Sequence, residues 1–344
     1  MAIGPSPTGS LTARLAYALK LASWPKLLVP WLLGQALGIA AAERLNAWAL
    51  VIGLGFTVFL LMFIVLLNDY ADAEVDALKR QMFPDGCSPK TIPDGVLSAR
   101  VVLRLGLGAG MLALALALVA QLTRVAGPPM GEDSIVAPFA TLCLGLFIAY
   151  SLPPLRVNYH GGGEWLEALG VGLLLPAFNF YLQAGRLEPL YGEPSFGAPP
   201  FEAALSAGPI WGSLAGFVLL SRASAVASGL SDEESDRLGG KRTVASVQGN
   251  ADARELTEEM LLGGAFVWIF LGAALLYGNK FTGVPWVLAG VVCALLFVPV
   301  RRLSKSAKTN AFAAQARYKA ALHRAIWLST ALLAVSALVA ARLT

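Results

Sequence analysis

The stretch LNAWALVIGLGFTVFLLMFIVLLNDYADAEVD, residues 45–76, decides the class of fold. Its first part, residues 45–67, carries no charged side chain and is long enough to cross a lipid bilayer as a helix. Its second part, residues 68–76, places four carboxylates at the end of that helix. An ionised carboxylate at the bilayer centre costs roughly 2.5 to 3.5 kcal/mol, and clustered carboxylates repel one another unless cations lie among them. The stretch therefore indicates either a solvated helix end or a functional site.

The spacing of these acids favours a site. Asn68, Asp72 and Asp76 follow one another at four-residue intervals, which places them on one face of a helix. A second cluster, SDEESDRLGGKRT, repeats the spacing with Asp232 and Asp236 after another apolar segment. Two acidic clusters at corresponding ends of two spans predict one site with carboxylates on opposing walls. Oxygen ligands of this kind suit Mg²⁺, which is usually completed by substrate phosphates, so we expect a diphosphate bound through magnesium.

The composition identifies a membrane protein. Hydrophobic residues make up 56% of the chain and charged residues 14%, against about 25% charged in soluble domains. We therefore expect an all-α fold, a polytopic bundle of about nine transmembrane helices. The charge-free stretches that would span the bilayer are residues 27–42, 45–67, 105–123, 134–155, 168–185, 203–221, 260–279, 281–300 and 325–341.

The distribution of Lys and Arg predicts the orientation. If both acidic clusters face the cytoplasm, that side collects all but five of the 26 cations. This asymmetry predicts a multi-pass protein of the cytoplasmic membrane with its active face toward the cytoplasm. It also accounts for the net charge of +4 without a nucleic-acid partner. The five outer cations are Arg44, Arg124, Arg186, Lys280 and Arg342.

We expect a single membrane-embedded domain over residues 1–344, with residues 1–26 as an interfacial segment. The second and sixth spans run in the same direction and end in similar acidic sequences, which is compatible with two parallel four-helix halves plus one helix. Pro176 and Asn179 predict a kink in the fifth span, with a polar group that needs a partner inside the bundle. Residues 249–260 are expected to form a solvated helix and residues 301–324 a basic helix on the inner surface.

Both acidic clusters carry a resemblance to a known family. Asn68-Asp69-x-x-Asp72-x-x-x-Asp76 resembles the NDxxDxxxD motif of the UbiA superfamily of intramembrane prenyltransferases. The second cluster, with Gly240-Lys241-x-Thr243 behind it, resembles the second DxxxD motif of that family. The resemblance implies Mg²⁺ as cofactor and a prenyl diphosphate as substrate. It implies that the catalytic residues are Asp69, Asp72 and Asp236, with Asp69 orienting the acceptor or taking its proton. The metal ligands that it implies are Asn68, Asp72, Asp76, Asp232 and Asp236.

Three weaker elements also resemble the family. Residues 20–34 are similar to the first-helix pattern of its quinone branch, residues 90–98 to its RPxPxGxxS element, and residues 150–156 to a YSxPPxR segment of quinone and chlorophyll-type members. The ordinary alternatives are positive-inside cations and an interfacial tyrosine. The substrate contacts that the resemblance implies are Lys20, Lys90, Tyr150, Ser151, Arg156 and Lys241.

The expected reaction is transfer of a prenyl group to an aromatic acceptor, a quinone or related lipid precursor, within the membrane. The segment before the second motif, residues 228–231, reads SGLS where quinone-branch members usually carry Asn-Asn-x-Arg, so the acceptor stays open. One alternative is a sugar-phosphate acceptor, and another is a secondary transporter, which also uses intramembrane acids and bent helices. Diphosphate release distinguishes an enzyme from a transporter, and the second product distinguishes the two enzymes.

Overall fold

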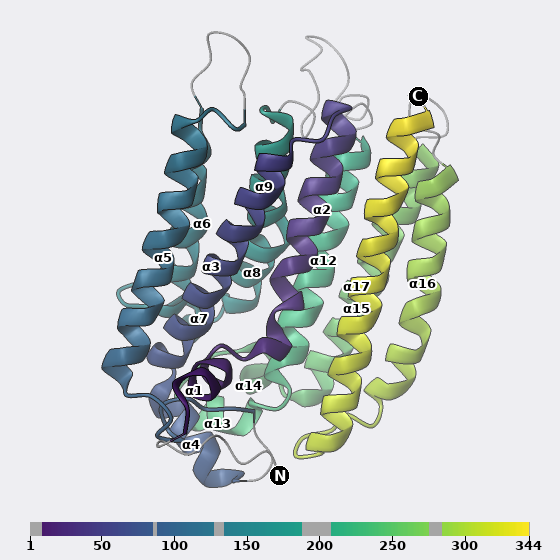
Figure 1. Cartoon of the computed structure of the whole chain (residues 1–344). Helices are drawn as coiled ribbons and strands as arrows, with labels where there is room; N and C mark the ends of the chain where they lie inside the picture. The colour runs from purple at the N-terminus through teal and green to yellow at the C-terminus, as the bar shows by residue number, and fades with distance from the viewer. Residues whose placement is uncertain (1–8, 85–87, 127–133, 188–207, 275–283, 344) are drawn as a thin grey trace.

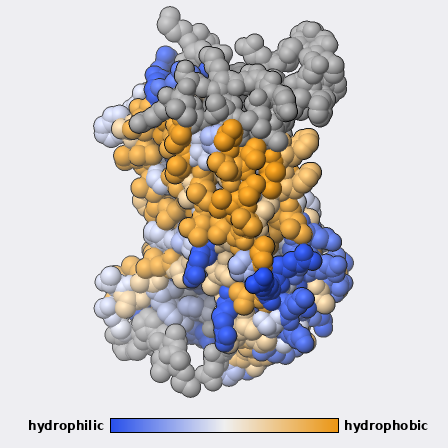
Figure 2. Space-filling model, turned by 90° about the vertical axis from the view of Figure 1, so that its right-hand side faces the viewer, coloured by the Kyte–Doolittle hydropathy of each residue, from blue (hydrophilic) through white to orange (hydrophobic). Residues whose placement is uncertain are grey.

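A computed structural model of the chain describes residues 9–84, 88–126, 134–187, 208–274 and 284–343. All the regular structure in these residues is helical, and the long helices run side by side along one axis (Figure 1). Hydrophobic side chains form a belt around the middle of the bundle on the side shown in Figure 2, and hydrophilic ones gather below it. The predicted helical membrane bundle is therefore confirmed, and the protein is an integral membrane protein.

The described residues contain six helices or helical runs that are long and apolar enough to cross a membrane. A seventh apolar helix is shorter, and α12 and α15 pack against each other in the same bundle. The count of nine spans remains a prediction. The long helices are α2 (Pro25–Ala42), α3 (Ala47–Ala71), α5 (Ala99–Leu122), α6 (Val136–Ser151), the run α8 (Gly163–Leu169), η2 (Gly170–Leu174) and α9 (Leu175–Ala184), α12 (Gly208–Gly229), α15 (Asn250–Ala274), α16 (Val284–Ser304) and α17 (Phe312–Leu343).

Short helices gather at one end of the bundle, the lower end in Figure 1. They are α1 (Leu11–Ala18), η1 (Leu21–Ser23), α4 (Ala73–Met82), α7 (Val157–His160), α13 (Glu233–Leu238) and α14 (Val244–Gln248). Of these, α4 follows directly on α3, and α13 follows closely on α12.

The two charged segments belong to long helices. Residues 250–260 are helical, as expected, and form the start of α15, which runs unbroken from Asn250 to Ala274. The expectation of one basic helix over residues 301–324 was wrong, because these residues are divided between the end of α16 and the first turns of α17, which continues to Leu343. In both places charged residues belong to the same helix as an apolar span, so charge does not mark the helix boundary.

The fifth span departs from regular α-helix just before Pro176, near the position where its sequence predicts a kink. Five residues, Gly170–Leu174, form a single π-helical turn between α8 and α9. The Asn179 side chain is fully buried, and its Oδ1 accepts a hydrogen bond of 2.9 Å from Gln35 Nε2 on α2. The polar group therefore has its partner inside the bundle, as expected.

Glycines allow the helices that carry the site to approach one another. A Cβ added to Gly34 would lie 2.2 Å from the carbonyl oxygen of Pro176, and one added to Gly172 would lie 2.7 Å from Val218 Cα. Helix α2 therefore packs directly on α9, and η2 directly on α12. The second approach places the start of the fifth span beside the helix that leads to the second acidic cluster.

Candidate active site

The first acidic motif lies where α3 gives way to α4. Asp72 occupies the joint, yet the helical hydrogen bonding continues through it, from the Asp72 amide to the Asn68 carbonyl at 2.9 Å and from the Asp76 amide to the Asp72 carbonyl at 2.8 Å. Asn68, Asp72 and Asp76 therefore share one face, and all three line a polar cavity of about 200 Å³. Glu74, in contrast, is exposed to solvent.

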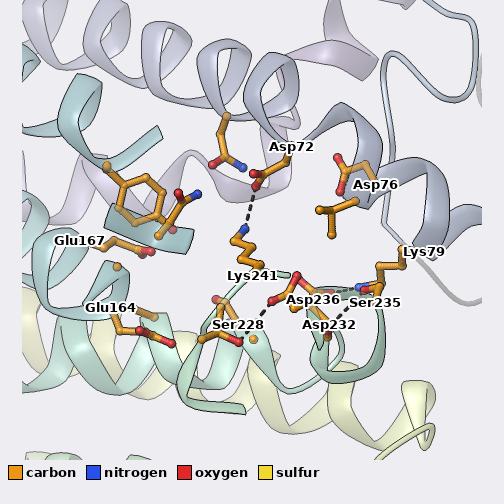
Figure 3. Close-up of a pocket in the computed structure, with 18 of the residues that line it drawn as sticks. Asp72, Asp76, Lys79, Glu164, Glu167, Ser228, Asp232, Ser235, Asp236 and Lys241 are labelled. Carbon is orange, nitrogen blue, oxygen red and sulfur yellow. Dashed lines mark hydrogen bonds and ion pairs between the residues drawn. The ribbon is translucent and has the colours of Figure 1, made fainter. Parts of the chain in front are cut away.

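The second acidic motif lies on the other wall of the same cavity. Asp232 precedes α13, and the Asp236 amide donates to the Asp232 carbonyl at 2.8 Å, so the two carboxylates are one helical turn apart. Helix α13 packs against α4, and both Asp232 and Asp236 line the cavity. Figure 3 shows Asp72 and Asp76 on one side and Asp232 and Asp236 on the other.

Lysines lie between the two acidic walls. Lys241 Nζ is 2.8 Å from Asp72 Oδ2 and reaches across the cavity in Figure 3. Lys90 pairs with Asp76, and Lys79, which is 3% exposed, pairs with Asp232. These cations offset the repulsion among the carboxylates and leave positive groups facing the cavity.

Charge and burial shift the titration of this cluster. Burial lowers the pKa of Lys241, but the opposing effect of the Asp72 carboxylate and its neighbours is larger, and the pKa is raised above its usual value. Burial raises the pKa of Asp236 to about 6, although the positive charge of Lys241 partly opposes the shift. Lys241 is therefore a permanent cation at neutral pH.

Asp69 lies behind this cavity. The carboxylate is 2% exposed, pairs with Lys20, and accepts a hydrogen bond of 2.5 Å from Thr91 Oγ1. It does not line either of the two cavities described here. The contacts indicate that Asp69 anchors Lys20, whose chain does line both cavities.

The YSxPPxR segment contributes in different ways. Tyr150 lines the cavity, and Ser151 is buried outside its lining. Arg156 Nη2 donates to the carbonyl of Ala71 at 2.7 Å, and its guanidinium carbon lies 3.6 Å from the centre of the Tyr159 ring. The Tyr159 hydroxyl in turn donates to Asp72 Oδ1 at 3.1 Å. Arg156 thus contacts the end of α3 rather than the cavity.

Two glutamates of α8 line the cavity and were not among the expected site residues. The backbone amide of Val244 donates to Glu164 Oε1 at 2.7 Å, while Glu167 pairs with Lys26. They were missed because the fifth span was expected to begin at residue 168, just after these charges. Lys79 was mentioned only as a loop cation, and the remaining unforeseen lining groups include Asn158, Ser228, Ser235 and Thr243.

A second cavity of about 200 Å³ adjoins the first and is mostly apolar. Leu61, Ile64 and Val65 of α3 line it together with Leu27 and Phe147. The residues that line both cavities, and so form their common boundary, are Lys20, Asn68, Tyr150 and Glu167.

The polar cavity offers oxygen donors rather than a finished metal site. In the part of the chain that the structure describes, no three His, Cys, Asp or Glu side chains converge closely enough to hold a metal ion. Asn68 Oδ1, however, is buried and has no hydrogen-bond partner. An amide oxygen beside carboxylates on two walls matches the oxygen donor set of Mg²⁺, which takes only some of its ligands from protein. The residues present therefore fit that ion.

Fold and site together define a membrane-embedded helical protein with a charged cavity that meets an apolar one. The sequence then identifies its family. Residues 27–327 match the model of the UbiA prenyltransferase family, so the chain belongs to that family and is a prenyltransferase. A search of curated proteins finds no match.

Solved structures with the same fold are distant in sequence. A UbiA homolog from Archaeoglobus fulgidus, bound to DMAPP and Mg²⁺, is 14% identical with a TM-score of 0.60, over 92% of this chain and 99% of that one. A UbiA homolog from Aeropyrum pernix K1 is 14% identical with a TM-score of 0.59, over 88% and 97% of the two chains. A structure described for digeranylgeranylglyceryl phosphate synthase is 11% identical with a TM-score of 0.55, over 95% and 98%. At these identities the likeness establishes the fold.

Proposed function

We propose that this prenyltransferase catalyses Mg²⁺-dependent transfer of a prenyl group from an allylic prenyl diphosphate to an aromatic acceptor, a quinone or related lipid precursor, with release of diphosphate. The observation that carries the proposal is the meeting of a polar cavity, lined by both acidic motifs, with an apolar cavity. A prenyl diphosphate has the same two parts. Structures of the Archaeoglobus fulgidus homolog bound to DMAPP and Mg²⁺ and to GPP and Mg²⁺ support the substrate class.

Five oxygen-bearing side chains of the polar cavity are the proposed holders of Mg²⁺, some of them through water. When bound, the ion supplies positive charge to the departing diphosphate. The unpartnered Asn68 Oδ1 supports this assignment, because it offers a free oxygen where a ligand is needed. The proposed ligands are Asn68, Asp72, Asp76, Asp232 and Asp236.

Lysines of the cavity wall are proposed to bind the diphosphate oxygens. Lys241 is the strongest candidate, since it lies between both acidic motifs and stays protonated. Lys90 and Lys20 line the same cavity from the loop after α4 and from the segment before α2. Breaking the allylic C–O bond builds negative charge on diphosphate, and cations fixed beside that charge stabilise the transition state. Arg156 is proposed to act indirectly, through the end of α3 and Tyr159.

The apolar cavity is proposed to hold the prenyl chain. Aliphatic side chains on its wall, among them Leu61, Ile64 and Val65, offer the prenyl chain an apolar surface. A water-poor setting protects the allylic cation from capture before the acceptor reacts. Leu61 and Val65 of α3 lie near the same end as Asn68. The chain and the diphosphate are therefore placed so that the breaking bond lies at the common boundary of the two cavities.

The aromatic acceptor is supported by the YSxPPxR segment and by the rings of Phe147 and Tyr150 beside the boundary. A phosphorylated acceptor is the second candidate. Lys26 lines the apolar cavity, where a cation would suit a phosphate group, and one structural neighbour is described for digeranylgeranylglyceryl phosphate synthase. The two candidates differ in the product they release.

The chain is further proposed to act as one membrane-embedded domain, with the segment before α2 at the interface and the active end facing the cytoplasm. The Lys and Arg distribution supports this orientation, because cations gather at the end that carries both acidic motifs. A cysteine-accessibility experiment in intact cells, with single cysteines introduced at exposed positions 74 and 43, tests it. Labelling of position 43 alone from outside is expected, and labelling of position 74 alone would contradict it.

The acceptor is tested with purified protein in lipid nanodiscs. Farnesyl or geranylgeranyl diphosphate and Mg²⁺ are supplied with aromatic, sugar-phosphate and glycerophosphate acceptors in parallel, and products are identified by mass spectrometry. A prenylated aromatic product is expected. A product formed only with a phosphorylated acceptor would replace the aromatic assignment with the second candidate. A wild-type protein that forms no product with any acceptor would contradict the proposed function.

A further inference from the structure

Glu167 is a partly buried acid that belongs to neither acidic motif. It lies on α8, its side chain is 17% exposed, and it lines both the polar and the apolar cavity. Among the described residues that form the common boundary, it is the one carboxylate; the others are Lys20, Asn68 and Tyr150. Helix packing fixes its position, because α8 contacts both α12 and α6.

The boundary is where the chemistry must occur. If the diphosphate occupies the polar cavity and the prenyl chain the apolar one, the bond that joins them crosses the boundary. The acceptor must approach the first prenyl carbon there as well. Asp69 is enclosed by Lys20 and Thr91 and does not line either cavity, so it is not placed to meet the acceptor.

We infer that Glu167 is the catalytic residue that receives the proton of the acceptor, an inference that rests on the proposed function. The C–O bond of the prenyl diphosphate breaks, and its electron pair leaves with diphosphate. The acceptor atom forms a new bond to the first prenyl carbon with its own electron pair. The proton that the acceptor loses passes to a Glu167 carboxylate oxygen and then to water, so atoms and charge balance.

The partner of Glu167 suits this role. Lys26 of α2 forms an ion pair with its carboxylate, which holds the side chain at the common boundary of the two cavities. An ionised carboxylate accepts a hydrogen bond from an acceptor hydroxyl, or takes the proton that a prenylated aromatic ring must lose. A fixed negative charge beside the first prenyl carbon also stabilises the positive charge that develops there. The structure therefore assigns acceptor-side chemistry to α8, at the common boundary of the two cavities.

The test compares Glu167→Gln with Glu167→Asp in nanodiscs, with farnesyl diphosphate, Mg²⁺ and whichever acceptor of the panel the wild type prenylates. General-base catalysis typically contributes about 100- to 10,000-fold, so kcat for prenylated product should fall at least about 100-fold in Glu167→Gln. KM for farnesyl diphosphate should stay within about threefold, because the diphosphate and chain contacts remain. Glu167→Asp keeps the charge and should recover part of kcat.

Controls separate this role from a structural one. Glu74→Gln removes a carboxylate at the same end of the bundle, but its side chain is exposed and should leave kcat unchanged. Thermal shift on adding Mg²⁺ and farnesyl diphosphate shows whether each variant still folds and binds. A folded Glu167→Gln with kcat near wild type would overturn the inference and leave the proposed function standing. Equal losses in Glu167→Gln and Glu167→Asp, with raised KM in both, would also overturn it. A wild type that turns over nothing would overturn both.

Discussion

Lys241 is expected to compete with Mg²⁺ for the Asp72 carboxylate. Its Nζ lies 2.8 Å from Asp72 Oδ2, and the two side chains are 12% and 5% exposed. Removing one partner of such a buried pair typically costs about 3 to 5 kcal/mol, because the other charge is left uncompensated. Lys241→Met should therefore lower the Tm in EDTA.

Adding Mg²⁺ should reverse much of that loss. If the ion offsets half of the cost, or about 1.5 to 2.5 kcal/mol, its apparent Kd falls by about 10- to 60-fold in Lys241→Met relative to wild type. Although Lys241→Met should bind Mg²⁺ more tightly, it should transfer the prenyl group less efficiently. Loss of a charged hydrogen-bond donor to diphosphate costs about 1.5 to 3 kcal/mol, so kcat/KM for prenyl diphosphate should fall by about 10- to 150-fold.

The assay is a Mg²⁺ titration in nanodiscs followed by thermal shift, with turnover measured on the same preparations. Lys305→Met is the matched control, since Lys305 is an exposed cation at the same end of the bundle. It should leave both Mg²⁺ affinity and turnover unchanged. Weaker Mg²⁺ binding in a folded Lys241→Met would refute the reasoning, because Lys241 would then be assisting the ion rather than competing with it.

Three further predictions concern the scaffold and the chain cavity. Burial opposes ionisation of Asp94, but donors from Arg80 and Tyr17 outweigh it and hold its pKa below the usual value. Above about pH 4, Asp94→Asn should therefore lower the free energy of unfolding by about 1 to 2 kcal/mol. The difference from wild type should vanish as the pH falls toward the lowered pKa of Asp94, and a series of Tm measurements over pH 3 to 7 would detect this. Gly34→Ala forces a Cβ against the Pro176 carbonyl and should destabilise the fold by about 1 to 3 kcal/mol, seen as a lower Tm, whereas Gly108→Ala, which meets open space, should not. Leu61→Trp fills the apolar cavity and should shift preference from geranylgeranyl toward geranyl diphosphate in a competition assay; an unchanged preference would exclude that cavity as the chain site.

Much of the site follows from local sequence. The four-residue spacing of Asn68, Asp72 and Asp76 defines a face on any helix, and the helical hydrogen bonding through Asp72 preserves it. The structure brings both motifs to one cavity, as the repeated spacing after two apolar segments predicted.

Tertiary contacts account for what the sequence did not predict. Glu167 lies in the first turns of a helix whose start was expected after it, because charge was taken as the end of a span. The same assumption separated the basic residues before position 325 from α17, although the helix is continuous. Arg156 was expected to contact substrate, but its Nη2 donates to the Ala71 carbonyl, 85 residues away in sequence. Side-chain direction at such sites depends on packing between distant helices.

The central claim is that two acidic walls act together on a prenyl diphosphate through Mg²⁺. The most direct measurement is diphosphate release by Asp72→Asn and Asp236→Asn in nanodiscs, with Mg²⁺ or EDTA and with Glu74→Gln as the exposed-acid control. We expect wild type and Glu74→Gln to release diphosphate only with Mg²⁺, and each wall variant to lose release at least about 100-fold while still folded. Release that survives EDTA, or survives loss of either wall, would contradict the account.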